Sequence, residues 1–195
     1  MSLPRRSFYA RPALALAPEL IGLHLVHFDH GTLRVGRIVE TEAYMGPHDL
    51  AAHSAGGRRT ARTEVMFGPP GHAYVYLIYG MWNCMNVVCA TDGVPHAVLL
   101  RALEPLGNVP RETWGPGLLC RAMNIDRRLN GADLREGTLR IERPARPRRA
   151  LRIGRSARIG VESAREWALR PWRFFDRDSP YVSRLPASRR APAMR

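Results

Sequence analysis

The sequence predicts a single domain of the α+β class, in which a curved, largely antiparallel sheet carries a protruding β-hairpin and helices pack at its edges. Two strand–turn–strand patterns, each with glycine in the turn, predict the antiparallel pairing. Short helix-like segments lie before and after these hairpins. A chain of 195 residues suits one domain and can bury a sizeable core. We expect residues 1–195 to form that domain, with residues 1–12 and 187–195 flexible.

The first elements read as a short helix followed by a hairpin. Ala-Pro-Glu at residues 17–19 predicts the start of a helix that ends at Gly22. Residues 23–28 predict a strand, Asp-His-Gly at residues 29–31 a turn, and residues 32–42 the antiparallel partner.

Two carboxylates close this second strand. Alternation along residues 32–42 places Glu40 and Glu42 on one face together with Ile38. A carboxylate among apolar neighbours is costly unless it is paired or used in chemistry. The pattern alone supports an ion pair with one of the many arginines as strongly as it supports catalysis.

The second hairpin is rich in aromatic residues. Residues 73–79 and 82–90 predict its strands, with Tyr74, Tyr76 and Ile78 on one face. Tyr79 stands beside Gly80 at the turn, where a side chain cannot be core. A tyrosine at this tip, beside Met81 and Trp82, is an exposed apolar wedge of the kind that unstacks bases.

The other segments contribute charge and shorter elements. A loop with His48 and His53 leads to residues 58–62, whose three arginines suit an approach to phosphate. Residues 98–100 predict a buried strand that delivers Arg101, and residues 115–123 predict a helix. Residues 140–152 read as an arginine-rich surface loop. Residues 154–164 predict a strand and helix, and the segment 166–169 is helical and stops before Pro171.

The net charge of +13 predicts a polyanionic partner, most simply nucleic acid; the alternative is a solvated basic surface. All 30 basic residues are arginine, and lysine is absent. No apolar run is long enough to span a bilayer, and we expect no signal peptide. Three cysteines do not make a disulfide framework, which favours a reducing compartment. Cys84 and Cys89 lack a companion pair for zinc, so we expect buried thiols.

Three motifs then point to a family. They are RIVETEAYMGPHDLAAHS at residues 37–54, YVYLIYGMWNCMN at residues 74–86 and VLLRALEP at residues 98–105. Through them the chain resembles the alkyladenine (3-methyladenine) DNA glycosylases, which are monofunctional base-excision enzymes. Weaker matches at residues 115–125, 158–161 and 166–183 extend the resemblance over nearly the whole chain, except the first dozen residues and the tail.

The resemblance implies a role for each matching residue. Glu42 corresponds to the general base that activates water, Arg101 to a side chain that holds this water, and Ile159 to a backbone carbonyl that contacts it. The resemblance implies a base pocket made of Tyr44, His53, Tyr76 and Asn86. It implies that Tyr79 and Met81 intercalate into the DNA, and that Arg58 and Arg59 contact the DNA backbone. The sequence departs from the family pattern at His48, Leu50, Trp82 and residues 108–113, which bears on substrate range.

The chemistry of the residues agrees with this resemblance. A base inside a duplex must be extruded before it can react, and aromatic stacking offsets the cost of unstacking. Bifunctional glycosylases attack through an amine, and without lysine only the N-terminal amine is left, so we expect hydrolysis by water. The expected partner is double-stranded DNA with a damaged purine, bound by a monomer in the cytoplasm at the nucleoid, without cofactor or metal.

Two alternatives belong to other classes of protein. A non-catalytic module, for example an RNA binder, would not need Glu42 together with Arg101. A metal-dependent nuclease would use Glu40, Glu42 and His53, and chelation would abolish its activity.

Overall fold

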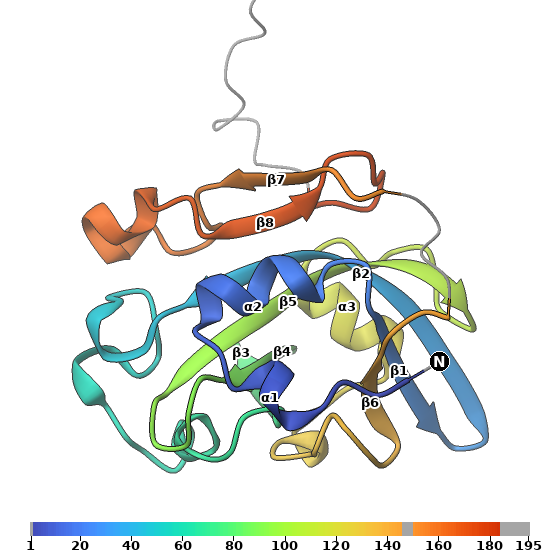
Figure 1. The fold of residues 1–195 in the computed structure, drawn as a ribbon, viewed down its shortest axis with the longest axis horizontal. Helices are drawn as coiled ribbons and strands as arrows, with labels where there is room; N and C mark the ends of the chain where they lie inside the picture. Colours follow the sequence, from blue (N-terminus) through green and yellow to red (C-terminus); the bar gives the residue numbers. More distant parts are fainter. Residues whose placement is uncertain (1, 146–149, 184–195) are drawn as a thin grey trace, which may run out of the picture.

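The computed structural model describes residues 2–145 and 150–183, which are built around one antiparallel sheet (Figure 1). Its strands run in the order β3-β4-β5-β2-β1-β6, and β8 pairs with both β2 and β7. Their bounds are β1 His24–Asp29, β2 Thr32–Tyr44, β3 Ala73–Ile78, β4 Trp82–Cys89, β5 His96–Gly107, β6 Leu139–Glu142, β7 Ile153–Ser156 and β8 Arg173–Asp176. The sheet curls around the core, which confirms the predicted α+β class with its curved antiparallel sheet.

Strand β2 organises the sheet because it has neighbours along its whole length. On one edge it pairs with β5; on the other, its first half pairs with β1 and residues 40–42 pair with β8. Figure 1 shows the β7–β8 hairpin above β2, and it continues the sheet there through the pairing of β8 with β2. The carboxyl end of β2 therefore lies between β5 and the C-terminal hairpin.

A β-bulge corrects one expectation about β2. The register with β5 shifts between Ile38 and Glu40, and again between Glu40 and Thr41. Ile38 and Ala43 belong to the main hydrophobic core, whereas Glu40 and Glu42 bond to polar groups outside it. The predicted shared face of Ile38 with the two carboxylates is wrong, because a bulge interrupts the alternation that the prediction assumed.

The helices flank this sheet. They are α1 (Arg6–Tyr9), α2 (Ala13–Leu20) and α3 (Pro116–Met123), with 3₁₀ segments at Gly46–His48, Ala55–Gly57, Glu64–Phe67, Arg127–Leu129 and Glu162–Leu169. Helix α2 begins four residues earlier than predicted and contains Pro18, since burial of Leu16 and Leu20 outweighs the one hydrogen bond that proline lacks. Within the N-terminal segment that we expected to be flexible, α1 buries Phe8 and Tyr9. Residues 187–195 lie outside the described residues.

Strand β6 corrects the prediction of a surface loop that begins at residue 140. Leu139 and Ile141 are buried while β6 pairs with β1, so the free edge of β1 orders a segment that its arginines and prolines had suggested was irregular. Strand β8 was not predicted. The helix predicted at residues 115–123 is confirmed as α3.

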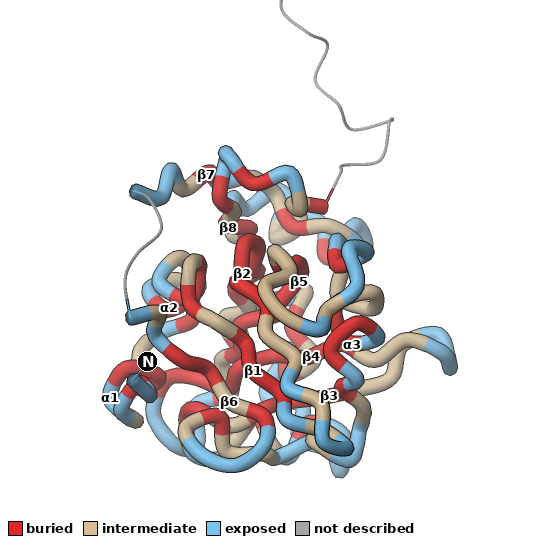
Figure 2. Tube along the Cα trace, turned by 90° about the vertical axis from the view of Figure 1, so that its right-hand side faces the viewer, coloured by how far each residue is buried: buried red, intermediate tan, exposed pale blue. Residues whose placement is uncertain are grey.

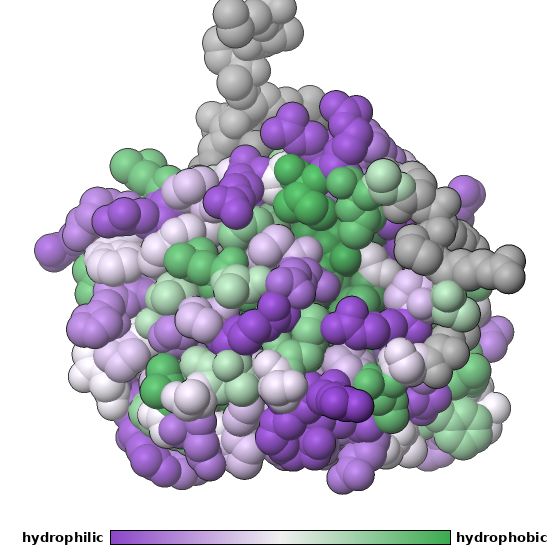
Figure 3. Space-filling view, in the orientation of Figure 1, coloured by the Kyte–Doolittle hydropathy of each residue, from purple (hydrophilic) through white to green (hydrophobic). Residues whose placement is uncertain are grey.

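Alternate residues of β3, β4 and β5 face two apolar clusters. Val75, Val87 and Val98 join the main core, against which α2 and α3 pack. Tyr74, Val88 and Ala97 face a second, smaller cluster with Met66 on the other side of the sheet. Figure 2 shows the central strands as the most buried part of the molecule. In Figure 3, the face seen in Figure 1 is largely hydrophilic, with a hydrophobic strip at its upper centre. No helix among the described residues is both long and apolar enough to span a bilayer.

Candidate active site

The carboxylate of Glu42 lies near the end of β2 and is fully buried. Oε1 accepts a hydrogen bond from the backbone N–H of Ile159 (2.8 Å), and Oε2 accepts one from the Tyr44 hydroxyl (2.9 Å). Arg101 Nη1 lies 3.4 Å from Oε1. The backbone amide of Ile159, the Tyr44 hydroxyl and the Arg101 guanidinium therefore surround this carboxylate.

Arg101 bridges the two carboxylates because of the same β-bulge. Glu40 pairs with Ala102 and Thr41 with Leu100, so Arg101 is the extra residue between them on β5. Its Nε donates to Glu40 Oε1 at 3.0 Å, and the side chain is almost fully buried.

Glu40 has a different environment from Glu42. Besides Arg101, it accepts hydrogen bonds from Arg173 Nε and from the backbone N–H of Ser183, both at 2.6 Å. Burial alone would raise the pKa of Glu40, but Arg101 and Arg173 outweigh it and hold that pKa below its usual value. The ion-pair interpretation of the sequence thus applies fully to Glu40, whereas Glu42 keeps only a long contact with Arg101.

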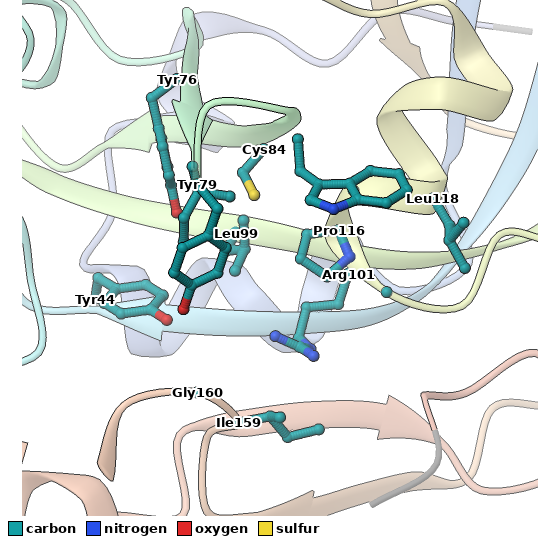
Figure 4. Close-up of a pocket in the computed structure, with 14 residues that line it drawn as sticks. Tyr44, Tyr76, Tyr79, Cys84, Leu99, Arg101, Pro116, Leu118, Ile159 and Gly160 are labelled. Carbon is teal, nitrogen blue, oxygen red and sulfur yellow. The ribbon is translucent and has the colours of Figure 1, made fainter. Parts of the chain in front are cut away.

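Two adjoining pockets open beside Glu42. The larger has a volume of about 470 Å³ and the smaller about 120 Å³, and they share Tyr44, Tyr76, Ile78 and Gly160. Figure 4 shows Tyr44, Tyr76 and Tyr79 gathered at one side of the larger pocket, while Arg101 extends from β5 toward Ile159. The start of α3 lines its other side, where Gly117 packs against the ring of Trp82.

The smaller pocket contains the four residues predicted to hold a base: Tyr44, His53, Tyr76 and Asn86. His53 Nδ1 lies 2.9 Å from the Tyr74 hydroxyl, and its ring meets Tyr76 edge-on at 4.6 Å. Burial, together with the charges of Arg62 and Arg58, lowers the pKa of His53 to about 4, so its ring is neutral near pH 7. Asn86 is buried and donates to the carbonyl of Tyr74 (3.2 Å).

Tyr79 stands at the tip of the β3–β4 hairpin. Tyr79 is 86% exposed and Met81 is 68% exposed. Tyr79 has φ 53° and Gly80 φ 69°, so a tyrosine occupies the left-handed region that favours glycine. Such strain at an exposed tip is typical of a residue retained for function.

The remaining predicted residues lie at the surface or contact Glu42 in another way. Arg58 and Arg59 are exposed, and Arg59 pairs with Glu64 through two bonds of 2.9 and 2.6 Å. Ile159 contacts Glu42 through its N–H. The contact of its carbonyl with water stays a prediction.

Sequence reasoning missed a buried ion pair behind the pocket. Arg158 is fully buried and binds Asp49 through two hydrogen bonds of 2.5 and 2.8 Å. The only sequence signal was its position directly before Ile159 in a motif of the family, and one arginine among so many is easily overlooked.

The metal set of the nuclease alternative, Glu40, Glu42 and His53, does not assemble in the described parts of the chain. No three His, Cys, Asp or Glu side chains there gather as they would around a metal ion. Glu40 and Glu42 are instead engaged by arginines, and His53 by Tyr74. Cys84, Cys89 and Cys120 are buried thiols, as predicted, and burial raises the pKa of each.

A tyrosine-lined pocket of this size accepts a planar heterocycle, and a basic surface binds a polyanion. Fold and site therefore suit a protein that binds the bases of nucleic acid. A family model for methylpurine-DNA glycosylase (MPG) matches residues 7–180. The chain belongs to this family and is a DNA glycosylase, an enzyme of DNA repair, which confirms the resemblance seen in its motifs.

Individual relatives agree with this assignment. A protein of Legionella pneumophila (strain Corby) is 52% identical, with coverage of 92% of this chain and 97% of its own. One of Myxococcus xanthus (strain DK1622) is 53% identical, with 96% and 97% covered. One of Bacillus cereus (strain G9842) is 45% identical, with 91% and 97% covered. Each is named "Putative 3-methyladenine DNA glycosylase".

Proposed function

We propose that this glycosylase extrudes a damaged purine from duplex DNA into the pocket between Tyr44 and Tyr76 and hydrolyses its N-glycosidic bond with water activated by Glu42. The observation that carries the proposal is the position of the Glu42 carboxylate. It is held by Tyr44, Ile159 and Arg101, which line the larger pocket, and Tyr44 also lines the adjoining smaller pocket in which the base would lie.

The bond-breaking step needs one base and no metal. Glu42 takes a proton from water, the water oxygen bonds to the sugar carbon, and the glycosidic electron pair leaves with the purine. Arg101 and the Ile159 carbonyl hold the water. The negative charge of Glu42 also stabilises the positive charge that develops on the sugar. N-alkylation makes the purine a good leaving group because it places positive charge on the ring.

The smaller pocket suits such a base. Tyrosine faces attract a cationic ring, and the neutral ring of His53 does not repel it. Asn86, at the wall formed by β4, discriminates among purines through its amide.

Tyr79 and Met81 fill the space that the extruded base leaves in the duplex. Both are exposed at a hairpin tip next to the larger pocket, so insertion removes little of their packing with the protein. Arg58 and Arg59 contact the DNA backbone, and Arg59 exchanges Glu64 for phosphate. The protein acts as a monomer in the cytoplasm, at the nucleoid.

Incubating the protein with duplexes that contain a single 3-methyladenine, 7-methylguanine, hypoxanthine or ethenoadenine tests the proposal. We expect the protein to release at least one of these bases, which chromatography then detects. The abasic strand stays intact, and the activity is retained in EDTA. Release of no base from any duplex would reject the proposal, and loss of activity on chelation would favour the nuclease alternative.

A further inference from the structure

Arg158 joins the two sides of the active site from behind. One side is the end of β2, with Glu42 and Tyr44, and the other is the segment after β7, with Ile159. Arg158 Nη1 donates to the carbonyl of Ala43 (2.9 Å), within β2. The same guanidinium donates to the carbonyl of Trp167 (3.2 Å).

The guanidinium also supports a wall of the base pocket. Its carbon lies 4.7 Å from the centre of the Tyr44 ring and 5.0 Å from that of Trp172. Arg158 lines neither pocket and has no exposed surface, so it backs Tyr44 on the side away from the space for the base. The orientation of Tyr44 matters twice, because its ring lines both pockets and its hydroxyl donates to Glu42.

Asp49 extends the arrangement to the loop that carries His53. Its carboxylate accepts hydrogen bonds from the backbone N–H groups of Met45 (3.1 Å) and Ala51 (3.0 Å) as well as from Arg158. Ala51 and His53 line the smaller pocket. One buried carboxylate thus fixes the turn after β2 and the guanidinium that backs Tyr44.

A buried ion pair adds little net stability compared with well-packed apolar residues, so stability alone does not explain why both charges are here. Geometry does. The planar guanidinium binds a carboxylate with two parallel hydrogen bonds, donates to two carbonyls and packs on an aromatic ring. A lysine ammonium cannot make all of these contacts together.

We propose that Arg158 and Asp49 form a positioning pair, which holds the Ile159 amide against Glu42 and the Tyr44 ring against the base. This inference rests on the proposed function for its catalytic consequence only. The geometric part, that Arg158 fixes the peptide of the next residue, holds for the free protein.

The test compares Arg158→Lys with Arg37→Lys. Arg37 is a matched control because it is also buried, lies on β2, pairs with Asp176 and Glu104, and lines neither pocket. Amide hydrogen exchange at Ile159 and single-turnover base release are measured at a temperature at which each variant is folded. Asp49→Asn serves as a second variant from the other side of the pair.

In Arg158→Lys and in Asp49→Asn we expect exchange at Ile159 to rise, and base release to fall, by about tenfold or more, the worth of a hydrogen bond to a charged group. Binding of undamaged duplex stays within about twofold, because phosphate contacts are untouched. Arg37→Lys lowers the unfolding temperature but leaves both readouts within about threefold.

Unchanged exchange at Ile159 in folded Arg158→Lys would overturn the proposal, as would equal effects in Arg37→Lys. If the wild-type protein released no base, the proposed function would fail, and the exchange measurement would still decide whether Arg158 positions Ile159.

Discussion

Removal of the Tyr79 side chain separates a role in DNA from a role in the fold. Because Tyr79 is 86% exposed, loss of its side chain takes almost no buried surface from the protein. Tyr79→Gly also relieves a φ of 53°, worth about 1–2 kcal/mol in the left-handed region. The extra entropy of glycine in the unfolded chain offsets about 0.4–1 kcal/mol. We expect the free energy of unfolding to stay equal or to rise by about 1 kcal/mol.

The effect on excision has the opposite sign. An aromatic stacking partner is worth about 1–3 kcal/mol, so loss of the wedge lowers the equilibrium for extrusion by roughly tenfold to a hundredfold. Tyr79→Ala gives the same loss of excision without relieving the backbone strain. Comparing it with Tyr79→Gly therefore separates the loss of the side chain from the change in stability. Salt-sensitive binding of undamaged duplex changes little, because arginines make those contacts.

Single-turnover excision on paired and mispaired hypoxanthine, if hypoxanthine is a substrate, measures this effect. The loss shrinks on the mispaired duplex, where less pairing energy opposes extrusion. An equal loss on both duplexes would refute the wedge and assign Tyr79 to the pocket or to the fold.

The remaining predictions concern charge and mechanism. Borohydride traps no covalent adduct, because the chain has no lysine to form a Schiff base; a trapped adduct would point to the N-terminal amine and rule out the hydrolytic mechanism. EDTA does not inhibit, because the proposed hydrolysis uses Glu42 as the base and no metal. The folded-state pKa of His53, about 4, lies below the unfolded value of about 6.5, so its contribution to stability is present at neutral pH and is lost as the pH falls from 6.5 toward 4. After allowance for partial exposure this contribution amounts to about 2 kcal/mol. In urea unfolding, we expect the free energy of unfolding to change less between pH 6.5 and pH 4 in His53→Gln than in the wild-type protein. An equal change in both proteins would contradict the shifted pKa. Arg58→Gln lowers the salt dependence of duplex binding by about one phosphate contact. Arg59→Gln lowers the salt dependence of duplex binding less, because Arg59 must first leave Glu64. A larger effect in Arg59→Gln than in Arg58→Gln would contradict this ranking of the two phosphate contacts.

The parts of the fold that the sequence predicted depend on local patterns. The β3–β4 hairpin has a turn that needs positive φ, and α3 begins at proline after glycine, so neighbouring residues sufficed for both. Local patterns did not predict strands β6 and β8, because pairing with strands distant in the sequence orders them, rather than their own composition. The bulge at Arg101 has no signature in composition at all.

The candidate site was predicted through motifs, and its three-dimensional contacts were not. Tyr44 and Arg101 stand in segments that match a family. Nothing in the spacing shows that the amide of Ile159 bonds to Glu42, 117 positions earlier in the chain. The Arg158–Asp49 pair was missed because burial distinguishes one arginine from another only after the chain has folded.

Two buried carboxylates on one strand allow a matched comparison, Glu42→Gln against Glu40→Gln. Glutamine keeps the shape of either side chain and cannot take a proton from water. Glu40 accepts hydrogen bonds from Arg101, Arg173 and Ser183, so removing its charge mainly lowers the free energy of unfolding. We expect Glu40→Gln to unfold at a lower temperature and to keep more of its rate than Glu42→Gln.

Single-turnover release of a damaged purine by Glu42→Gln is the most direct test of the proposed mechanism. The variant is measured folded and saturated with a lesion duplex, beside the wild-type protein. We predict that duplex binding persists while base release is abolished, because glutamine cannot take the proton from water that the proposed mechanism assigns to Glu42. Release within about tenfold of wild type would contradict the assignment of Glu42.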